Sequence, residues 1–360
     1  MTVIHIDDLL KYAVEQQCSD LHLKAGTVPT VRISGHLAAT AFPELDAKLC
    51  AEMADQMMDE GQAEHLTKVG EVDFGYTAPN LGRFRVNVHR TRGTVGISAR
   101  RILPEPPSFQ ALGLPEAVEA LGNEHRGLVL ITGPTSSGKT TTTGAILGHI
   151  NSSRACHILT IEDPIEILHD DNRSIVTQRE IGQDTHDFAS ALRAAMRQDP
   201  DVIFVGEIRD METVKAALQA AETGHFVLAT LHTTNATETI NRIIEFFPPH
   251  EQKQTRVALA GALVGVISQR LLPKAGGGRV AAIEIMVMNG RIRDLILDPD
   301  RTHEIVDIIA ESGFYGMQTF DQAVVELVKK ELVSMDDAKA AATNPHDFEL
   351  ALKQQGVISI

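Results

Sequence analysis

The sequence predicts an α/β fold in which a smaller α+β domain precedes a larger domain built on a parallel sheet. After residue 113, continuous apolar runs alternate with segments of helical spacing, which is typical of buried parallel strands covered by helices. Before residue 104, apolar and polar residues alternate, as in half-buried strands. We therefore assign residues 1–103 and 113–360 to the two domains. Three prolines in LPEPPSF indicate a linker at 104–112.

The composition is that of a globular intracellular protein. The chain has 360 residues, 43% of them hydrophobic, and a formal net charge of −15, which disfavours non-specific binding to nucleic acid or an anionic membrane. Three distant cysteines offer no disulfide framework. The acidic N-terminus is unlike a signal peptide, and the longest apolar stretch, VALAGALVGVI, is about half the length that crosses a bilayer. We expect a cytoplasmic protein that inserts no segment into the membrane and reaches it only through a partner.

The elements follow from residue spacing. In the first domain we expect a helix within 7–17, strands in SDLHLKAG and TVRISGHL, helical structure over 46–66, and a meander of strands over 71–102. In the second domain the buried runs LVLIT, HILTI, VIFVG and FVLATL predict parallel strands, with helices such as DFASALRAAMRQ and METVKAALQAAETG between them. Beyond about residue 290 the spacing predicts mostly helix.

The segment Gly133-Pro134-Thr135-Ser136-Ser137-Gly138-Lys139-Thr140 matches GxxxxGK[ST] between a predicted strand and a predicted helix. Small residues let successive backbone N–H groups surround a phosphate at a helix N-terminus. Lys139 supplies charge to the β- and γ-phosphates, and the Thr140 hydroxyl suits Mg²⁺. The candidate nucleotide-binding set extends to Thr141, although the motif requires no role for the threonines after Thr140. The motif predicts ATP and Mg²⁺ as ligands.

Polar groups follow three other buried strands, where open α/β sheets bind their ligands. Glu162, Asp163 and Glu166 follow HILTI, Glu207 follows VIFV, and His232 follows FVLATL. A carboxylate can polarise the attacking water, and a histidine can hydrogen-bond the γ-phosphate. Each acid alone could equally be a solvated cap residue, but their coincidence at several strand ends favours hydrolysis. His225 is also a candidate nucleotide-binding residue, although its place at the start of its strand fits a structural role equally well.

One departure concerns the metal. The second phosphate-loop motif usually has an aspartate directly after its strand, whereas here Gly206 stands there and Glu207 follows. We expect Thr140 and Glu207 as metal residues, with Mg²⁺ held mainly through water.

Four segments resemble, in order and spacing, the signature boxes of the secretion ATPases that drive type II secretion and type IV pili: GPTSSGKT, TIEDPIE, DPDVIFVGEIRD and AAETGHFVLATLHTT. SDLHL and RFRVNV resemble the N-terminal domain of that family. The short N-terminal region, the lack of a tetracysteine insertion and GRIRDLI at 290–296 resemble its pilus retraction branch, the PilT family. GRIRDLI is an imperfect match to AIRNLI and also fits an ordinary amphipathic helix.

This resemblance implies a homohexameric ring with a PAS-like N-terminal domain and a RecA-like P-loop ATPase domain. It implies Glu166 and Glu207 as catalytic carboxylates and His232 near the γ-phosphate. Arg83 and Arg100 would reach nucleotide at a domain or subunit boundary. Arg83 could instead be a strand residue that faces solvent, and the neighbouring Arg85 and Arg101 could take either role. The expected partner is the inner-membrane platform protein of the pilus, with pilin affected indirectly and no nucleic acid bound.

Three other functions stay open. The same motor could assemble pili or drive type II secretion, although the short N-terminal region and absent zinc cysteines argue against this. A nucleotide-gated binding module would need no water-activating acid. A DNA translocase is possible on fold grounds alone, but the acidic composition counts against it.

Overall fold

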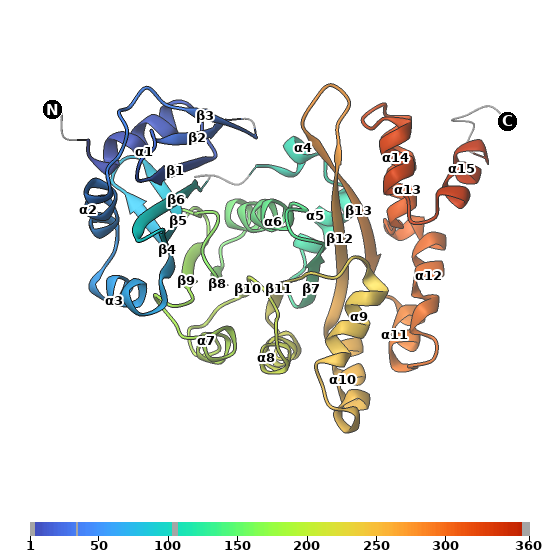
Figure 1. Ribbon diagram of the computed structural model, residues 1–360. Coiled ribbons are helices and arrows are strands. Elements are labelled where there is room, and N and C mark those ends of the chain that lie inside the picture. Colours follow the sequence, from blue (N-terminus) through green and yellow to red (C-terminus); the bar gives the residue numbers. More distant parts are fainter. Residues whose placement is uncertain (1–3, 34, 103–106, 355–360) are drawn as a thin grey trace. The chain divides into compact units, whose positions relative to one another are not determined.

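A computed structural model describes residues 4–33, 35–102 and 107–354 of the chain (Figure 1). The chain forms two compact units. The first consists of residues 1–105 together with residues 164–169, and the second consists of residues 106–163 and 170–360. The predicted boundary at 103–104 lies outside the described residues. Part of the predicted linker is folded, because residues Phe109–Leu112 form helix α4, whose Ser108 cap accepts a hydrogen bond from Ala111 N.

The first unit is a six-stranded antiparallel sheet packed against helices. Its strand order is β3-β2-β1-β6-β5-β4, and each neighbouring pair is antiparallel. In chain order the elements are α1 (Ile6–Glu15), β1 (Asp20–Lys24), β2 (Thr30–Ile33), β3 (His36–Ala39), α2 (Ala47–Met57), α3 (Glu60–Val69), β4 (Glu71–Ala78), β5 (Gly82–Thr91) and β6 (Thr94–Arg101). The predicted helices and strand meander are confirmed, with the 46–66 helical region divided in two at Met58 and Asp59.

Alternation along these strands produces the core of the first unit. In β5 the side chains of Phe84, Val86 and Val88 are buried, while the intervening polar residues lie on the other face of the sheet. The buried face of the sheet packs against apolar residues of α1 and α2 such as Leu9 and Met53. The other face therefore carries the polar side chains of β1, β5 and β6.

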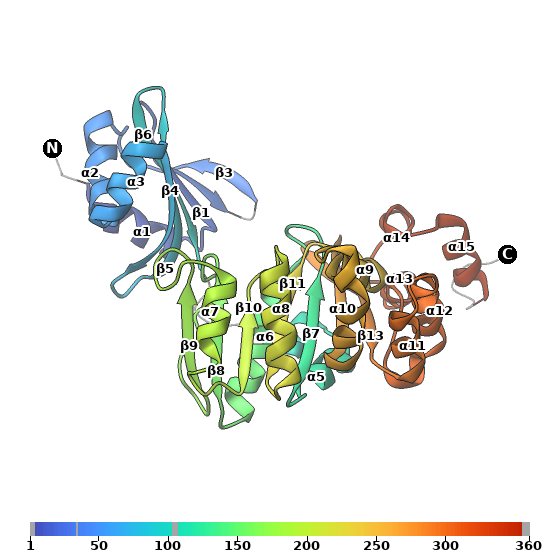
Figure 2. The same cartoon turned by 90° about the horizontal axis from the view of Figure 1, so that it is seen from below.

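The second unit is built on a seven-stranded mixed sheet of order β13-β12-β7-β11-β10-β8-β9. Figure 2 shows these strands side by side, and all neighbours are parallel except the antiparallel pair β12–β13. The elements are α5 (Glu116–Gly122), β7 (Gly127–Thr132), α6 (Lys139–Ser153), β8 (His157–Glu162), β9 (Ile175–Glu180), α7 (Phe188–Ala195), β10 (Val202–Val205), α8 (Met211–Glu222), β11 (Phe226–Leu231), α9 (Ala236–Glu245), α10 (Pro249–Ala262), β12 (Leu263–Pro273) and β13 (Arg279–Val287).

Both faces of this sheet are buried, as the unbroken apolar runs predict. In β7, Leu128 and Leu130 belong to the core cluster that includes α7, α8 and α10. Val129 and Ile131 belong to the cluster on the other face, with α4, α5 and α6. Figure 1 shows these helices on opposite sides of the strands.

The chain beyond residue 290 is helical, as predicted. It forms α11 (Gly290–Leu297), α12 (Ile305–Glu311), α13 (Phe320–Lys329), α14 (Met335–Ala341) and α15 (Pro345–Gln354), with two short 3₁₀ turns, η1 (Thr302–Glu304) and η2 (Gly313–Tyr315). In α11, which contains GRIRDLI, Ile292, Leu295 and Ile296 are buried at core spacing.

The stretch VALAGALVGVI spans two elements, since α10 ends at Ala262 and β12 begins at Leu263. Throughout the ranges that the structure describes, we find no helix with the length and apolar character needed to cross a membrane.

Candidate active site

The phosphate-loop motif connects the end of β7 to the start of α6, as its spacing predicts. The loop turns through three left-handed residues, Gly133 (φ 148°), Ser136 (φ 64°) and Gly138 (φ 92°). A Cβ atom on Gly133 would meet the carbonyl oxygen of Gln269 and lie 2.5 Å from Ser137 Oγ. The loop is therefore too narrow at Gly133 for any side chain, which is the geometric reason for the first glycine of the motif.

Gln269 on β12 fastens the loop to the sheet. Its Nε2 donates to the carbonyl oxygen of Ser137 at 2.9 Å, and its Oε1 accepts from Thr142 Oγ1 at 2.7 Å. Both Gln269 and Thr142 are buried. Sequence reasoning missed Gln269, because nothing in the sequence shows that a residue more than a hundred positions away pairs with this loop.

The loop has the properties of a phosphate site. Lys139 Nζ folds back over the loop and donates to the carbonyl oxygens of Gly133 at 2.6 Å and Pro134 at 3.1 Å. Thr140 and Thr141 stand half-exposed at the first turn of α6. In the part of the chain that the structure describes, the buried Ser137 Oγ has no hydrogen-bond partner. A helix start, a nearby ammonium and an unsatisfied hydroxyl together fit an anion.

The parallel strands β7, β8, β10 and β11 end at one edge of the sheet, where the loop lies. Two side chains contact Glu207 there: His232, which follows β11, and Arg209, which follows β10 as Glu207 does. Its Oε1 lies 3.0 Å from His232 Nε2, a contact that is an ion pair only when the imidazole is protonated. Its Oε2 accepts from Arg209 Nε at 2.8 Å and lies 2.7 Å from a terminal nitrogen of the same guanidinium.

Arg209 extends this cluster to a third strand end, because its Nη1 donates to Asp163 Oδ2 at 3.1 Å. The hydrogen bond to Glu207 is the largest of the effects that raise the pKa of Arg209. The structure thus brings together the predicted Asp163, Glu207 and His232, and it adds Arg209. The sequence signal for Arg209 was its place two residues after Glu207.

Glu162 has a different setting from Glu207. It is 7% exposed, and its Oε1 accepts from Thr160 Oγ1 at 2.6 Å and from Gln178 Nε2 at 3.1 Å. These contacts hold its carboxylate on one face of the sheet, over β8 and β9.

Glu166 belongs to the short segment 164–169 of the first unit, where its Oε1 lies 3.7 Å from Arg85 Nη1. Arg85 faces Arg100 directly across the β5–β6 pair. Arg100 Nε donates to Asp20 Oδ1 at 2.8 Å. Burial opposes ionisation of Asp20, but the hydrogen bonds from Arg100 and Ser19 outweigh it and lower the pKa of the carboxyl group.

Arg83, the other predicted arginine, lies one alternation along β5 from Arg85. Its Nη1 donates to Thr77 Oγ1 at 3.1 Å, and its guanidinium covers Gly75 of β4. The structure therefore brings Arg85, rather than Arg83, opposite Arg100.

The structure does not bring His225 to the phosphate loop. It directly precedes β11, and Phe226 pairs with Gly127 at the start of β7, whereas the loop follows Thr132 at the other end. The His225 ring contacts the carbonyl oxygen of Ala220 at 3.0 Å. Within one chain, the expectation that His225 binds nucleotide is corrected: it stands at the amino end of its strand and closes the α8–β11 turn.

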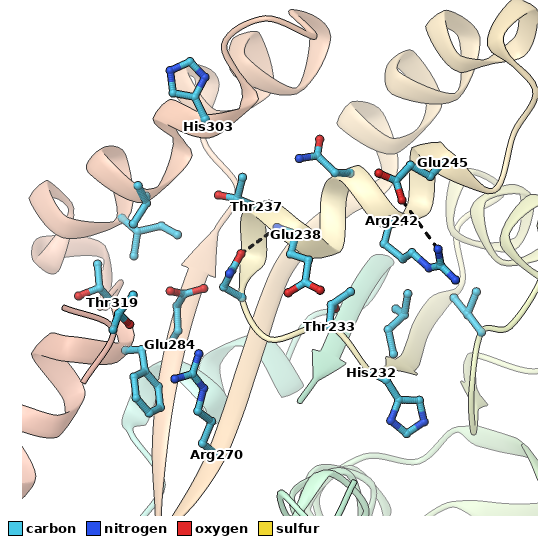
Figure 3. Close-up of a pocket in the computed structure, with 18 of the residues that line it drawn as sticks. His232, Thr233, Thr237, Glu238, Arg242, Glu245, Arg270, Glu284, His303 and Thr319 are labelled. Atoms are coloured by element: carbon cyan, nitrogen blue, oxygen red, sulfur yellow. Dashed lines mark hydrogen bonds and ion pairs between the residues drawn. The ribbon is translucent and has the colours of Figure 1, made fainter. Parts of the chain in front are cut away.

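A cavity of about 1010 Å³ adjoins Glu207 and His232 and extends beside α9 toward the C-terminal helices (Figure 3). Near its other end lie Glu284 of β13 and Arg270 of β12. Glu284 is buried and accepts from Ala236 N at 2.7 Å, and burial raises the pKa of its carboxyl group. The Arg270 guanidinium lies 4.0 Å from the centre of the Phe320 ring. The edge of the sheet that carries Glu207 and His232 thus opens onto this cavity.

The mixed α/β sheet, the phosphate loop and the acids beside it define a nucleotide-using protein of the P-loop class. Residues 2–279 match the family described as Type II/IV secretion system protein, and the chain belongs to this family.

Two curated relatives are closely similar. The chain is 43% identical over 343 residues to the type IV pilus retraction ATPase PilT of Pseudomonas aeruginosa, with 95% of this chain and 99% of that protein covered. It is 42% identical over 318 residues to a twitching motility protein of Neisseria gonorrhoeae, covering 88% and 84% of the two chains.

A crystal structure of the pilus retraction motor PilT with bound ADP resembles the fold with a TM-score of 0.89. It is 45% identical in sequence, and the match covers 96% of this chain and 99% of that one. The α/β fold and mixed sheet therefore match those of a nucleotide-binding secretion ATPase.

Proposed function

We propose that this chain is an ATPase motor that drives retraction of type IV pili. The observation that carries the proposal is the meeting of Asp163, Glu207 and His232 at the sheet edge where the phosphate loop lies. Binding alone needs a phosphate loop, whereas hydrolysis also needs groups that orient water and stabilise developing charge. The similarity to PilT over nearly the whole chain supports pilus retraction as the work that this hydrolysis performs.

Residues Gly133–Thr141 bind the phosphates in this proposal. The N–H groups at the start of α6 surround the β-phosphate, and Lys139 leaves the loop carbonyls to contact the β- and γ-phosphates. Thr140 and Glu207 are the proposed metal residues. Where the structure describes the chain, no group of three or more His, Cys, Asp or Glu could hold a metal ion. The Thr140 hydroxyl and the Glu207 carboxylate are oxygen donors of the kind that suits Mg²⁺, which takes one or two protein ligands together with phosphate oxygens and water. When bound, Mg²⁺ neutralises the charge on the β- and γ-oxygens.

The proposed hydrolytic groups divide the remaining work. Glu207 and Glu166 orient and polarise the attacking water, and His232 donates a hydrogen bond to the γ-phosphate. Since His232 pairs with Glu207 at 3.0 Å, one imidazole can exchange between a carboxylate and a phosphate oxygen. We propose no direct contact with the reacting atoms for Glu162, because its carboxylate already accepts hydrogen bonds from Thr160 and Gln178.

Coupling to mechanical work requires parts that move relative to one another. We propose a PAS-like first domain and a RecA-like second domain assembled in a homohexamer, with Arg85, Arg100 or Arg83 reaching nucleotide from the first domain. Arginine suits this role because its permanent charge and fork of donors match phosphate oxygens. The proposed partner is the inner-membrane platform protein of the pilus, so the motor works at the cytoplasmic side without inserting into the membrane.

Phosphate release by the purified chain tests the enzymatic part. Lys139→Ala should abolish steady-state ATP hydrolysis while the far-UV circular dichroism spectrum stays that of the wild type. Lys215→Ala on the exposed side of α8 is the matched control and should leave the rate unchanged. Hydrolysis by Lys139→Ala at the wild-type rate would exclude this site.

The direction of the motor is tested in a deletion strain. Excess surface pili without twitching motility indicate retraction. Loss of surface pili would instead identify an assembly motor of the same family, and a chain that binds ATP without turnover would be a regulatory module.

A further inference from the structure

We propose that Arg209 is the positioning residue that aims Glu207. Arg209 holds one oxygen of the carboxylate and leaves the other as the working oxygen. This inference rests on the proposed ATPase function and concerns a residue that the phosphate-loop motif does not include.

The two oxygens of Glu207 have different partners. Arg209 approaches Oε2 with two nitrogens, Nε at 2.8 Å and a terminal nitrogen at 2.7 Å. Within the described residues, Oε1 contacts one nitrogen of this cluster, His232 Nε2 at 3.0 Å. Two charge-assisted contacts to one atom fix its position more strongly than a single contact fixes the other. Oε1 is therefore the oxygen that can exchange its partner for water.

Arg209 is itself anchored on the far side. Its third nitrogen, Nη1, donates to Asp163 Oδ2 at 3.1 Å, so the planar guanidinium is held between the ends of β8 and β10. A guanidinium held at both edges cannot turn without losing one of these contacts. The orientation of Glu207 thus depends on two strands of the sheet rather than on its own loop alone.

The backbone around Glu207 supports the same conclusion. Gly206 N donates to Ile161 O at 2.8 Å, and Ile208 N donates to Thr230 O at 2.9 Å. These bonds hold the residues on either side of Glu207 against the neighbouring strands, while the Glu207 side chain is 20% exposed at the edge. The backbone is fixed, and the remaining freedom of the side chain is what Arg209 removes.

The geometry also separates arginine from lysine. A lysine at 209 keeps the positive charge, but its single nitrogen cannot place two donors on Oε2 and a third on Asp163 at once. If charge alone mattered, Arg209→Lys would behave as wild type. If orientation matters, Arg209→Lys should lie between the wild type and Arg209→Gln.

The test is steady-state ATP hydrolysis by the full chain. We expect Arg209→Gln to lower kcat about 10- to 100-fold, the cost of misplacing a catalytic group by about an ångström, with KM for ATP within about twofold of the wild type. Arg209→Lys should recover part of the lost kcat. In a Glu207→Gln background, adding Arg209→Gln should change kcat less than about twofold, because the group to be aimed is already absent.

Arg193→Gln is the matched control. Its side chain is 57% exposed, close to the 54% of Arg209, and it pairs with Glu212 at 3.8 Å on the helices α7 and α8. We expect its kcat and KM to equal those of the wild type.

Several results would overturn the inference. Wild-type kcat in Arg209→Gln would show that Glu207 needs no such support. A raised KM with unchanged kcat would mean that Arg209 binds nucleotide instead. Full activity of Arg209→Lys would reduce its role to charge. If Arg209→Gln fails to fold, the positioning role is tested with Arg209→Lys and Asp163→Asn instead. Wild-type kcat in both variants would reject the proposal. A wild-type protein that releases no phosphate would instead reject the proposed ATPase function itself.

Discussion

Replacement of Gln269 by leucine tests how the phosphate loop is held. The buried Gln269 side chain makes two hydrogen bonds, one to the Ser137 carbonyl oxygen at 2.9 Å and one from Thr142 Oγ1 at 2.7 Å. Leucine has a similar size but neither donor nor acceptor, so Gln269→Leu leaves two groups unpaired. Each such buried group costs about 1–3 kcal/mol, so the free energy of unfolding should fall by roughly 2–6 kcal/mol.

A second substitution should change the free energy of unfolding in opposite directions in the wild type and in Gln269→Leu. Thr142→Val alone should destabilise the protein by about 1–2 kcal/mol, because Gln269 Oε1 loses its donor. In the Gln269→Leu background the same substitution removes a hydroxyl that has lost its partner, on a residue that is 1% exposed. There it should raise the free energy of unfolding by about 1 kcal/mol. The two substitutions are therefore strongly non-additive.

Urea unfolding followed by far-UV circular dichroism measures these changes, since the chain contains no tryptophan for fluorescence. Nucleotide must be absent and the protein concentration constant, because ligands and subunit contacts shift apparent stability. Gln219→Leu, on the exposed side of α8, is the control and should change stability by less than about 0.5 kcal/mol. Additive effects of Gln269→Leu and Thr142→Val would refute the proposed anchoring of the loop.

Three further predictions follow from the same structure. Gly133→Ala should abolish binding of a fluorescent ATP analogue, because the added Cβ would meet Gln269 O and Ser137 Oγ. Gly261→Ala is the control and should bind the analogue normally, because its Cβ would have open space. Normal binding by Gly133→Ala would contradict the inference that the loop is too narrow for a side chain. The pKa of Asp20 is lowered from 3.8, so this carboxyl group binds fewer protons in the folded protein than in the unfolded chain. Its contribution to stability should be present above about pH 3.8 and fade below that pH. Urea unfolding midpoints measured across pH should show this dependence in the wild type and not in Asp20→Asn. Burial raises the pKa of Glu284 above 4.5, so this carboxyl group keeps its proton to a higher pH in the folded protein than in the unfolded chain. The free energy of unfolding should therefore fall as pH rises from about 4.5 through the folded-state pKa. If Glu284→Gln shows the same dependence of stability on pH as the wild type, another group causes it.

Much of the fold was predictable because it depends on local patterns. The runs at Leu128, Val202 and Phe226 are apolar on both faces, and only a covered parallel sheet buries such strands. The less regular strands were not predicted. β9 is a partly exposed edge strand, and β12 follows α10 without any intervening turn residue. Spacing alone does not reveal where an apolar stretch changes from helix to strand.

The sequence by itself determined the phosphate loop and the strand ends that carry Glu207, His232 and Asp163. These are local features, since a loop of small residues between a strand and a helix has one conformation suited to an anion, and parallel strands must end at one edge. Only the tertiary structure decided which groups pair there. Arg209 reaches Asp163 across 46 positions while it holds Glu207, and Gln269 joins β12 to Ser137 of the loop across 132. Such contacts depend on strand order and side-chain direction, which no local pattern encodes, because the residues meet only after the sheet has formed.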